Sequence, residues 1–374
     1  MRNSLVSAFI AAVLAGSFLA CDSAKEIKIG GAGPVTGDSA TFGISTRNGY
    51  DMAIEEWNAK GGVLGKQVKM FFADDKGDPA EGATVWTKLI AQDKCVAIVG
   101  TVFSKVSLAG APICQAAKVP MLTPSSTNPR VTKVGDWIFR SCFIDTFQGS
   151  VGAKFATETL KAKKAACFFD VGDDYSKGLS EFFKAKFSTL GGSVVGYEGH
   201  ATGAVDFKAQ LTKILATNPD VLYLSDHYND AALAAKQARE LGYKGPMLGG
   251  NGWESPKLIE LGGAALEGCY YTNDYSSEDI SPLVQDFVKS YKAKYKEVPD
   301  ALAALGYDGM NIMLDAIQRA GSAKNVDIKA ALLKTDWPGV TGHVKFDENR
   351  DSVKSVAIIE IKGGKLVFHS TVNA

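Results

Sequence analysis

The sequence lacks a second apolar run long enough to span a membrane, and it lacks the local motifs of several common enzyme classes. Beyond the N-terminal segment, no run reaches the roughly 18 apolar residues that mark a spanning helix. The chain has no P-loop, no G-x-S-x-G nucleophile elbow, no H-E-x-x-H zinc motif and no EF-hand loop. These absences exclude P-loop nucleotide hydrolysis, α/β-hydrolase chemistry and the metal sites of those motifs.

The chain also lacks an excess of either charge. Lysine plus arginine number 41 and aspartate plus glutamate number 41, so the formal net charge at pH 7 is zero. No global electric field would draw such a protein to nucleic acid or to anionic lipid. We therefore expect no nucleic-acid partner.

Cysteine and histidine are too few and too scattered for a metal centre. None of the six cysteines has C-x-x-C spacing, and the five that follow Cys21 are an odd number. One disulfide, between Cys95 and Cys114, and buried free thiols are equally compatible with this pattern. We expect no metal site and no cofactor.

The N-terminus has the pattern of an export signal. Residues 1–20 carry one charge, Arg2, and then an apolar run that ends in small residues, which is typical of a secretory signal peptide. The run ends FLAC, which resembles the lipobox of bacterial lipoproteins, although Phe18 replaces the usual aliphatic residue. We expect a periplasmic or cell-surface protein, in which a lipid on Cys21 would provide membrane contact; simple cleavage near the same point is the alternative.

The most informative stretch runs from Val96 to Thr127 and reads as strand, helix, strand. Ser104 follows the first strand, and the segment Ser125 to Thr127 follows the second. In an open parallel sheet both segments leave the carboxyl ends of their strands, which is the edge where such sheets bind ligands. Hydroxyl groups and free helix N–H groups suit a small carboxylate there. The structural alternative is that Ser104 only caps its helix and TPSST is only a turn.

The rest of the chain alternates strands and helices twice, which indicates two α/β units. A glycine-rich turn follows the first strand, but Thr36 stands where a dinucleotide fingerprint needs its third glycine. A strand is expected over 137–143, after which a second alternation begins. Two long helices without strands follow near residues 282–320, and the tail reads as strands with a Gly-Gly hairpin.

Aromatic residues recur in segments that follow strands, where they would form either the walls of a cleft or parts of each lobe's core. His227 also follows a strand, so it could line a pocket. Its neighbour Asp226 would point to the opposite side of an extended segment, so no catalytic dyad is implied. The aromatic residues in question are Phe42, Phe103, Tyr175, Tyr228 and Trp253.

From Glu26 to its C-terminus the chain resembles the leucine/isoleucine/valine-binding proteins of bacterial ABC importers. The resemblance rests on the segments IKIGGAGPVTGDSATFG, VGTVFS with TPSST, DDYSKG, DFKAQLTKI and ALGYDG. It implies the type I periplasmic-binding-protein fold, in which two doubly wound Rossmann-like α/β lobes are joined by three crossover segments. Lobe one would comprise 26–145 plus 275–351, and lobe two 146–274 plus 352–374, with crossings near Asp145, Asp274 and Ser352.

The resemblance also assigns ligand contacts. The family's carboxylate-binding serine falls on Ser104, and its second pair of contacts to the carboxylate and amino groups falls on Ser125 and Thr127. An aromatic wall residue falls on Phe42, and a second-lobe tyrosine falls on Tyr175. Phe103, an aromatic residue that follows the third predicted strand, is expected to line the same site.

Two positions depart from the family. His227 stands where a second tyrosine is usual, and Asn251 stands where an acidic residue pairs with the ligand's ammonium group. Asn251 can accept a hydrogen bond but supplies no charge. Asp226 is then the expected charge partner; if it points away, the ligand would be a carboxylate without an amino group, or an amide.

Together these observations predict a substrate-binding protein that captures an amino acid, branched-chain or otherwise aliphatic, and delivers it to the membrane subunits of an ABC permease without changing it. The alternatives are a receptor-linked sensor for an amide or a small carboxylate, and an enzyme that uses His227.

Overall fold

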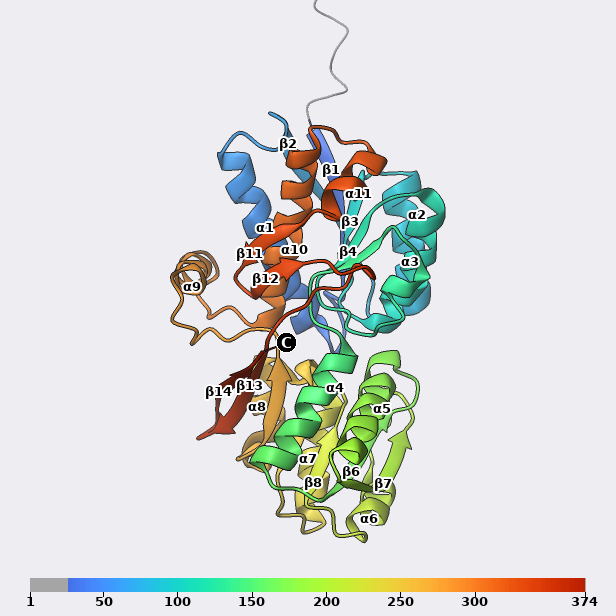
Figure 1. The fold of residues 1–374 in the computed structure, drawn as a ribbon, viewed down its shortest axis with the longest axis vertical. Helices are drawn as coiled ribbons and strands as arrows, with labels where there is room; N and C mark the ends of the chain where they lie inside the picture. Colours follow the sequence, from blue (N-terminus) through green and yellow to red (C-terminus); the bar gives the residue numbers. More distant parts are fainter. Residues whose placement is uncertain (1–25, 374) are drawn as a thin grey trace, which may run out of the picture.

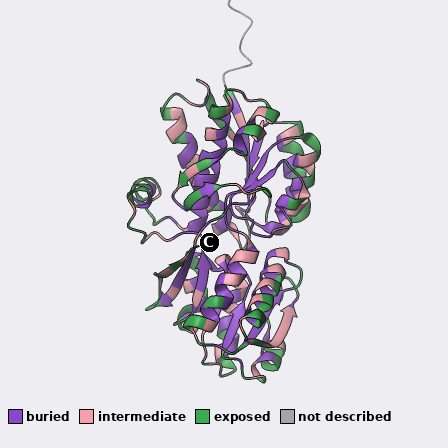
Figure 2. Cartoon of the chain, viewed as in Figure 1, coloured by how far each residue is buried: buried purple, intermediate pink, exposed green. Residues whose placement is uncertain are grey.

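The computed structural model describes residues 26–373, which form two lobes that lie one above the other (Figure 1). The predicted signal peptide, residues 1–20, and Cys21 lie outside the described residues. Each lobe is a sheet covered by helices on both faces, and the buried residues follow the two sheets (Figure 2).

The first sheet contains five parallel strands in the order β2-β1-β3-β4-β5. The three strands from β3 to β5 are short and fully buried, as expected for a parallel sheet with both faces covered, whereas the edge strand β2 is mostly half-buried. The five strands are β1 (Glu26–Gly33), β2 (Gln67–Asp74), β3 (Ala97–Val99), β4 (Met121–Thr123) and β5 (Ile138–Arg140).

Alternating side chains of these strands pack against different helices. On one face, Val99 and Leu122 contact helices α1 (Ala40–Ala59) and α10 (Ala301–Ala320). On the other face, Ile98 packs against α2 (Pro79–Ala91) and α3 (Ser104–Ala117). The late helix α10 therefore belongs to the first lobe, beside α1. The short helix α11 (Asn325–Leu332) packs against α10.

The second sheet has seven strands in the order β14-β13-β10-β9-β8-β6-β7. The five strands from β10 to β7 are parallel. At the β10 edge, β13 pairs antiparallel with β10, and β14 pairs antiparallel with β13. Gly363 and Gly364 both have positive φ in the turn between β13 and β14, which confirms the predicted Gly-Gly hairpin. The bounds are β6 (Lys164–Asp170), β7 (Ser193–His200), β8 (Val221–Leu224), β9 (Met247–Gly249), β10 (Tyr270–Asn273), β13 (Val356–Lys362) and β14 (Lys365–Val372).

Helices cover both faces of this second sheet too. One face packs against α4 (Asp145–Lys154) and α5 (Asp174–Thr189). The other packs against α6 (Lys208–Leu215), α7 (Tyr228–Glu240) and α8 (Pro256–Gly262).

The chain passes between the two sheets three times. The passages are residues 141–144, the segment from Asp274 to the start of α9 (Pro282–Tyr295), and the segment between β12 (Gly342–Lys345) and β13. The buried guanidinium of Arg140, at the end of β5, forms a 2.8 Å ion pair with Asp351 of the third passage. A buried charge pair thus holds the third passage to the end of β5, where the first passage begins.

The sequence patterns missed some elements and overextended others. The strand expected over 137–143 is shorter, because β5 ends at Arg140 and the chain then leaves the sheet. Helix α4 was not predicted, and it continues into a π-helical turn at Phe155–Thr159. Strand β12 pairs with β11 (Asp336–Gly339) as a separate two-stranded ribbon.

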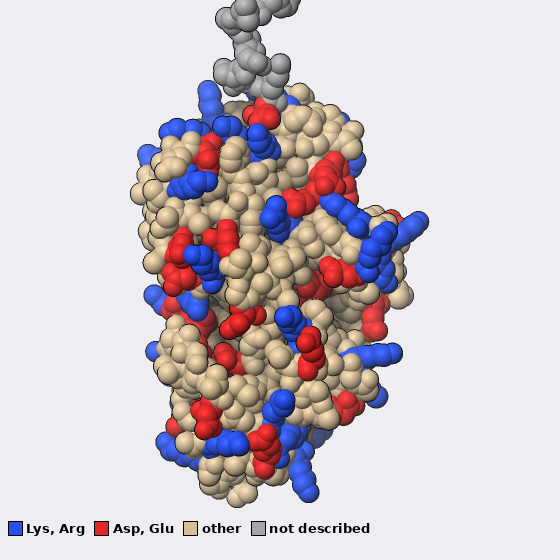
Figure 3. All heavy atoms as spheres, turned by 180° about the vertical axis from the view of Figure 1, so that it is seen from behind, with Lys and Arg blue, Asp and Glu red and all other residues tan. Residues whose placement is uncertain are grey.

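The five cysteines among the described residues are all free thiols. Cys95 and Cys114 are both buried free thiols, as are Cys142, Cys167 and Cys269, so the Cys95–Cys114 disulfide is not formed. Within residues 26–373 no helix has the length and apolar character needed to cross a membrane, and no cluster of metal-ligating side chains is present. On the face shown in Figure 3, basic and acidic side chains are interspersed.

Candidate functional site

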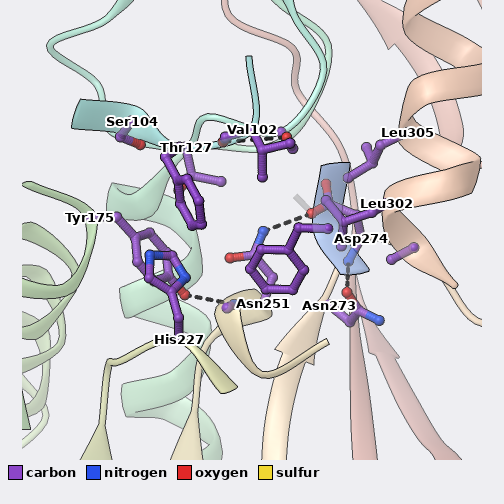
Figure 4. A pocket seen from close by; sticks show the side chains of 15 residues that line it. Val102, Ser104, Thr127, Tyr175, His227, Asn251, Asn273, Asp274, Leu302 and Leu305 are labelled. Atoms are coloured by element: carbon purple, nitrogen blue, oxygen red, sulfur yellow. Dashed lines mark hydrogen bonds between the residues drawn. The ribbon is translucent and has the colours of Figure 1, made fainter. Parts of the chain in front are cut away.

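A pocket lies between the two lobes, at the carboxyl ends of parallel strands from both sheets (Figure 4). Eight of the predicted site residues line it, and Asp226 does not. Asp274 is the only acidic side chain among the described residues that line it. The lining comprises Phe42, Val102, Phe103, Ser104, Ser125, Thr127, Tyr175, His227, Asn251, Gly252, Asn273, Asp274, Ala301, Leu302 and Leu305.

Ser104 does not act as a cap for helix α3. It is the first residue of the helix, and its hydroxyl accepts a hydrogen bond from the backbone N–H of Asn128, 3.2 Å away. The first N–H groups of a helix have no acceptor within the helix, so this end of α3 offers donors to an anion. The structural alternative for Ser104, a helix cap, is therefore not what the geometry shows.

The loop after β4 presents Ser125 and Thr127 beside Ser104. A buried guanidinium shapes this loop: Arg140 donates to the carbonyl oxygens of Ser126 and Asn128 at 2.7 and 2.8 Å. The hydroxyl of Ser125 donates to the Val102 carbonyl at 3.4 Å.

The Thr127 hydroxyl is buried beside the carboxyl group of Asp145, whose pKa it lowers against the larger effect of burial, but it makes no hydrogen bond of good geometry. A buried polar atom without a partner is uncommon in native structures, and in a ligand pocket it marks a group that a polar ligand can satisfy.

The walls of the pocket are aromatic. The His227 ring stacks on Tyr175, with ring centroids 4.9 Å apart, and meets the edge of Phe103 at 4.7 Å. Phe42 packs 5.8 Å from Phe103 and 5.9 Å from His227. Tyr228 and Trp253 do not line the pocket. Both are fully buried, and the Trp253 indole N–H donates to the Leu224 carbonyl.

His227 is close to a carboxylate that is not itself in the pocket. Its Nε2 lies 3.6 Å from Asp173 Oδ2, and Lys105 of the first lobe lies 3.5 Å from the same oxygen. Burial raises the pKa of Asp173, but the contact with His227, the charge of Lys105 and the backbone N–H of Ser176 together outweigh burial and hold the pKa well below its usual range. Asp173 therefore carries a negative charge that draws lobe-one Lys105 toward lobe two.

Asn251 lies in a short turn that approaches Tyr175 closely. The backbone N–H of Gly252 donates to the Tyr175 hydroxyl at 2.9 Å. A Cβ atom at Gly252 would lie 2.9 Å from the Tyr175 ring and 3.0 Å from His227 Nδ1, so only glycine allows this approach. The backbone N–H of Asn251 donates to Gln148 Oε1 at 2.7 Å. The Asn251 side chain is directed at the pocket (Figure 4).

The Asn251 side chain meets the carboxylate of Asp274. Asn251 Nδ2 donates to Asp274 Oδ2 at 3.1 Å, and the Phe143 N–H donates to Asp274 Oδ1 at 3.3 Å. Burial raises the pKa of Asp274 to about 6, although the positive charge of Lys354 opposes the rise. Asp274 directly follows β10, so it reaches the pocket from the second passage between the lobes.

Asp226 is not in the pocket. It accepts hydrogen bonds from the Asp170 N–H and the Ser176 hydroxyl, both at 2.7 Å, and lies 3.3 Å from His200 Nε2. The prediction that Asp226 pairs with a ligand ammonium does not fit this position. Sequence reasoning noticed Asp274 only as a crossing point; its adjacency in space to Asn251 depends on the pairing of β9 with β10.

Contacts between residues outside the pocket show the two lobes close together. Arg130 of the first lobe pairs with Asp174 of the second at 2.6 Å, and the Tyr228 hydroxyl donates to the Asp38 carbonyl at 2.6 Å. The pocket encloses a free volume of about 30 Å³, which is too small for an amino acid unless its walls move.

Solved structures of binding proteins share this fold over nearly the whole chain. A leucine-binding protein LivK from Thermotoga maritima is 42% identical, with a TM-score of 0.90, and the match covers 93% of this chain and 99% of that one. The branched-chain amino acid transporter substrate-binding protein LivJ from Streptococcus pneumoniae, solved in complex with isoleucine, is 33% identical, with a TM-score of 0.88 and coverage of 94% and 100%.

Sequence relatives agree with the structures. The Leu/Ile/Val-binding protein BraC3 of Rhizobium johnstonii is 31% identical over 349 residues, which cover 91% of this chain and 93% of that protein. The family model described as periplasmic binding protein matches residues 26–365. With the two-lobed fold and the pocket between its lobes, the chain belongs to the periplasmic binding protein family.

Proposed function

We propose that this protein captures a branched-chain or other aliphatic amino acid between its two lobes and delivers it to the membrane subunits of an ABC importer. Its family consists of binding proteins of transporters rather than enzymes, and membership implies an extracytoplasmic location. The resemblance to LivK, a leucine-binding protein, and to LivJ, solved in complex with isoleucine, supports the choice of ligand.

The observation that carries this proposal is the opposed polarity of the pocket. On the lobe-one side, the hydroxyls of Ser104 and Thr127 and the first N–H groups of α3 can donate to a carboxylate, and the Ser125 hydroxyl can join them by giving up its long 3.4 Å bond to the Val102 carbonyl. Elsewhere in the lining, the carboxylate of Asp274 can accept from an ammonium group. A pocket with donors at one place and a single carboxylate at another suits a zwitterion.

The remaining lining residues fit an apolar side chain. Phe42, Phe103 and Tyr175 provide aromatic walls, and Leu302 and Leu305 of α10 provide aliphatic ones. We assign Asn251 the role of orienting Asp274 and, with it, the ligand's amino group. His227 stacks on Tyr175 and contributes a wall that can also donate a hydrogen bond.

One experiment separates capture from its alternatives. The purified protein is incubated with a mixture of amino acids, washed, denatured and analysed for released small molecules by mass spectrometry. Retention of an unchanged aliphatic amino acid supports the proposal. A new product would indicate an enzyme that uses His227, and retention of an amide or a carboxylate without an amino group would indicate the sensor alternative.

We further propose the lobe boundaries 26–145 plus 275–351 and 146–274 plus 352–374, which would make the three passages the hinges of closure. Small-angle scattering should then give a smaller radius of gyration when ligand is added. An unchanged radius at saturation would contradict closure around the ligand.

We also propose that residues 1–20 are removed on export and that Cys21 is lipidated, which would tether the protein near its permease. The FLAC segment supports this assignment. Metabolic labelling with a radioactive fatty acid, compared with a Cys21→Ser variant, tests it.

A further inference from the structure

A second, larger cavity lies between the lobes, beside the pocket described above. It has a free volume of about 440 Å³, within the ~300–1,000 Å³ range typical of small-molecule sites. The first lobe contributes the start of α1 and the segment before α10, and the second lobe contributes Tyr271 and residues of β13 and β14. The two cavities share Asn273, but otherwise their linings differ.

The charges that line this second cavity have one sign. Glu254, Glu278, Glu297 and Asp300 line it, and no lysine, arginine or histidine is among the described lining residues. Glu254 is buried, and burial raises its pKa to about 7 and that of Asp300 to about 6. Raised carboxyl pKa values mean that the negative charge is poorly compensated, so a positive guest would be stabilising.

The cavity wall is also aromatic, and it holds a polar group without a partner. Tyr271, Tyr275, Tyr291 and Phe368 line it. Tyr275 is only 5% exposed, and its hydroxyl has no hydrogen-bond partner. Such a hydroxyl needs a partner that the chain does not provide. Aromatic faces beside carboxylates attract cations that also have apolar surface.

From this cavity we infer a second binding site, specific for an organic ammonium ion with an apolar body. An anion is opposed by the four carboxylates. A bare metal ion would leave most of the cavity unfilled, and the described residues contain no cluster suited to one. An ammonium head can lie among the carboxylates while its apolar part contacts the tyrosine rings and Val298.

The position of Glu254 connects this site to closure of the lobes. Glu254 belongs to the second lobe, and its Oε1 accepts a 3.0 Å hydrogen bond from the N–H of Ala301, the first residue of α10 in the first lobe. Ala301 and Leu302 line the first pocket. A cation that touches Glu254 and Asp300 at once contacts both lobes, so it favours the state in which they are close together.

The test uses phenethylammonium as the probe and 3-phenylpropanoate, an anion of similar shape, as its counterpart. Both are titrated calorimetrically into the full chain at about pH 8, where the lining carboxyls are charged. We expect saturable one-to-one binding of phenethylammonium and none of the anion. No saturable binding of the cation, or equal binding of both probes, would overturn the inference.

Two matched variants locate the binding. Ser277→Arg places a guanidinium in the lining of the second cavity and should weaken phenethylammonium at least about tenfold. Ile280→Arg adds the same charge on a side chain that is 92% exposed and outside the lining, so affinity should change less than about threefold. Binding that survives Ser277→Arg but is lost in Asp274→Asn would mean that the probe occupies the first pocket, and the inference would be withdrawn.

Discussion

The two lobes contribute different chemistry to the pocket between them. Lobe one supplies short hydroxyl-bearing segments, Ser104 and Ser125 to Thr127, whose conformation is already fixed by hydrogen bonds and by the buried Arg140. Lobe two supplies the rings of Tyr175 and His227, which stack on one another, and His227 also meets Phe103 and Phe42 of the opposite lobe edge-on. The acidic group, Asp274, belongs to the passage between them.

This difference suggests a division of roles. Fixed donors can recognise a carboxylate while the lobes are apart, because their geometry does not depend on the second lobe. The rings, in contrast, form a wall only when His227 approaches Phe103 and Phe42. Asp274 would bind the ammonium group from the passage between the lobes.

The largest effect is expected from Asp274→Asn. Removing one partner of a desolvated charge pair typically costs about 2 to 5 kcal/mol, so leucine should bind roughly 30-fold to several thousand-fold more weakly. Calorimetric titration measures this loss. The control is 4-methylpentanoate, which is leucine without its amino group and should bind the variant about as well as it binds the parent protein. Equal losses for both ligands would remove Asp274 from its assigned role.

Ser104→Ala should weaken both ligands, because both carry the carboxylate. A hydrogen bond to a charged group is worth about 1.5 to 3 kcal/mol, which corresponds to roughly 10- to 100-fold. Ser107→Ala is the matched control. Ser107 lies in the same helix as Ser104, but its hydroxyl is 2.8 Å from Ser126 Oγ and does not line the pocket. We expect the control to lower the melting temperature and leave binding near normal. If Ser104→Ala behaves like the control, the carboxylate assignment passes to Ser125 and Thr127 alone.

Acid should weaken leucine selectively. The pKa of Asp274 is raised to about 6, so its carboxylate is mostly charged at pH 7 and mostly protonated at pH 5. The affinity ratio of leucine to 4-methylpentanoate should therefore fall up to about tenfold between these values.

The stability of the ligand-free protein should change with pH in the opposite direction, rising as the pH falls. A carboxyl whose pKa is raised on folding disfavours the folded state when it is charged, so protonating Asp274 below about pH 6 relieves a cost. Melting curves of the parent protein and Asp274→Asn at both pH values separate this effect from binding. For binding itself, a leucine to 4-methylpentanoate affinity ratio that stayed constant between pH 7 and pH 5 would contradict the role of Asp274.

The smallest effect is expected from the exposed ion pair between the lobes. The Arg130 side chain is 67% exposed in its ion pair with Asp174, and exposed pairs contribute at most about 1 kcal/mol. Arg130→Ala should weaken leucine less than about fivefold, and the difference should shrink in high salt. A much larger loss would show that the ring-lined side depends on this charge pair for closure.

Sequence reasoning located most of the pocket because position along a strand determines it. Ser104, Ser125 and Thr127 follow parallel strands, and local pattern alone brings their segments to one edge of a sheet. Asp274 was missed as a ligand contact because its role depends on the spatial pairing of β9 with β10, which joins it to Asn251. Asp226 was overrated because nothing in the sequence shows that Ser176 and His200 already occupy its carboxylate. Helix α4 was missed because its sequence has no clear apolar stripe.

The buried thiols give each lobe an internal reporter of its own unfolding. Cys95 and Cys114 lie in the first lobe, Cys167 and Cys269 in the second, and burial raises the pKa of all four thiols. A thiol that is buried and protonated reacts with alkylating reagents only when the surrounding structure opens. The rate at which each cysteine is alkylated therefore measures how often its own lobe opens, and peptide mapping can read the two lobes separately in one native sample, without any introduced label.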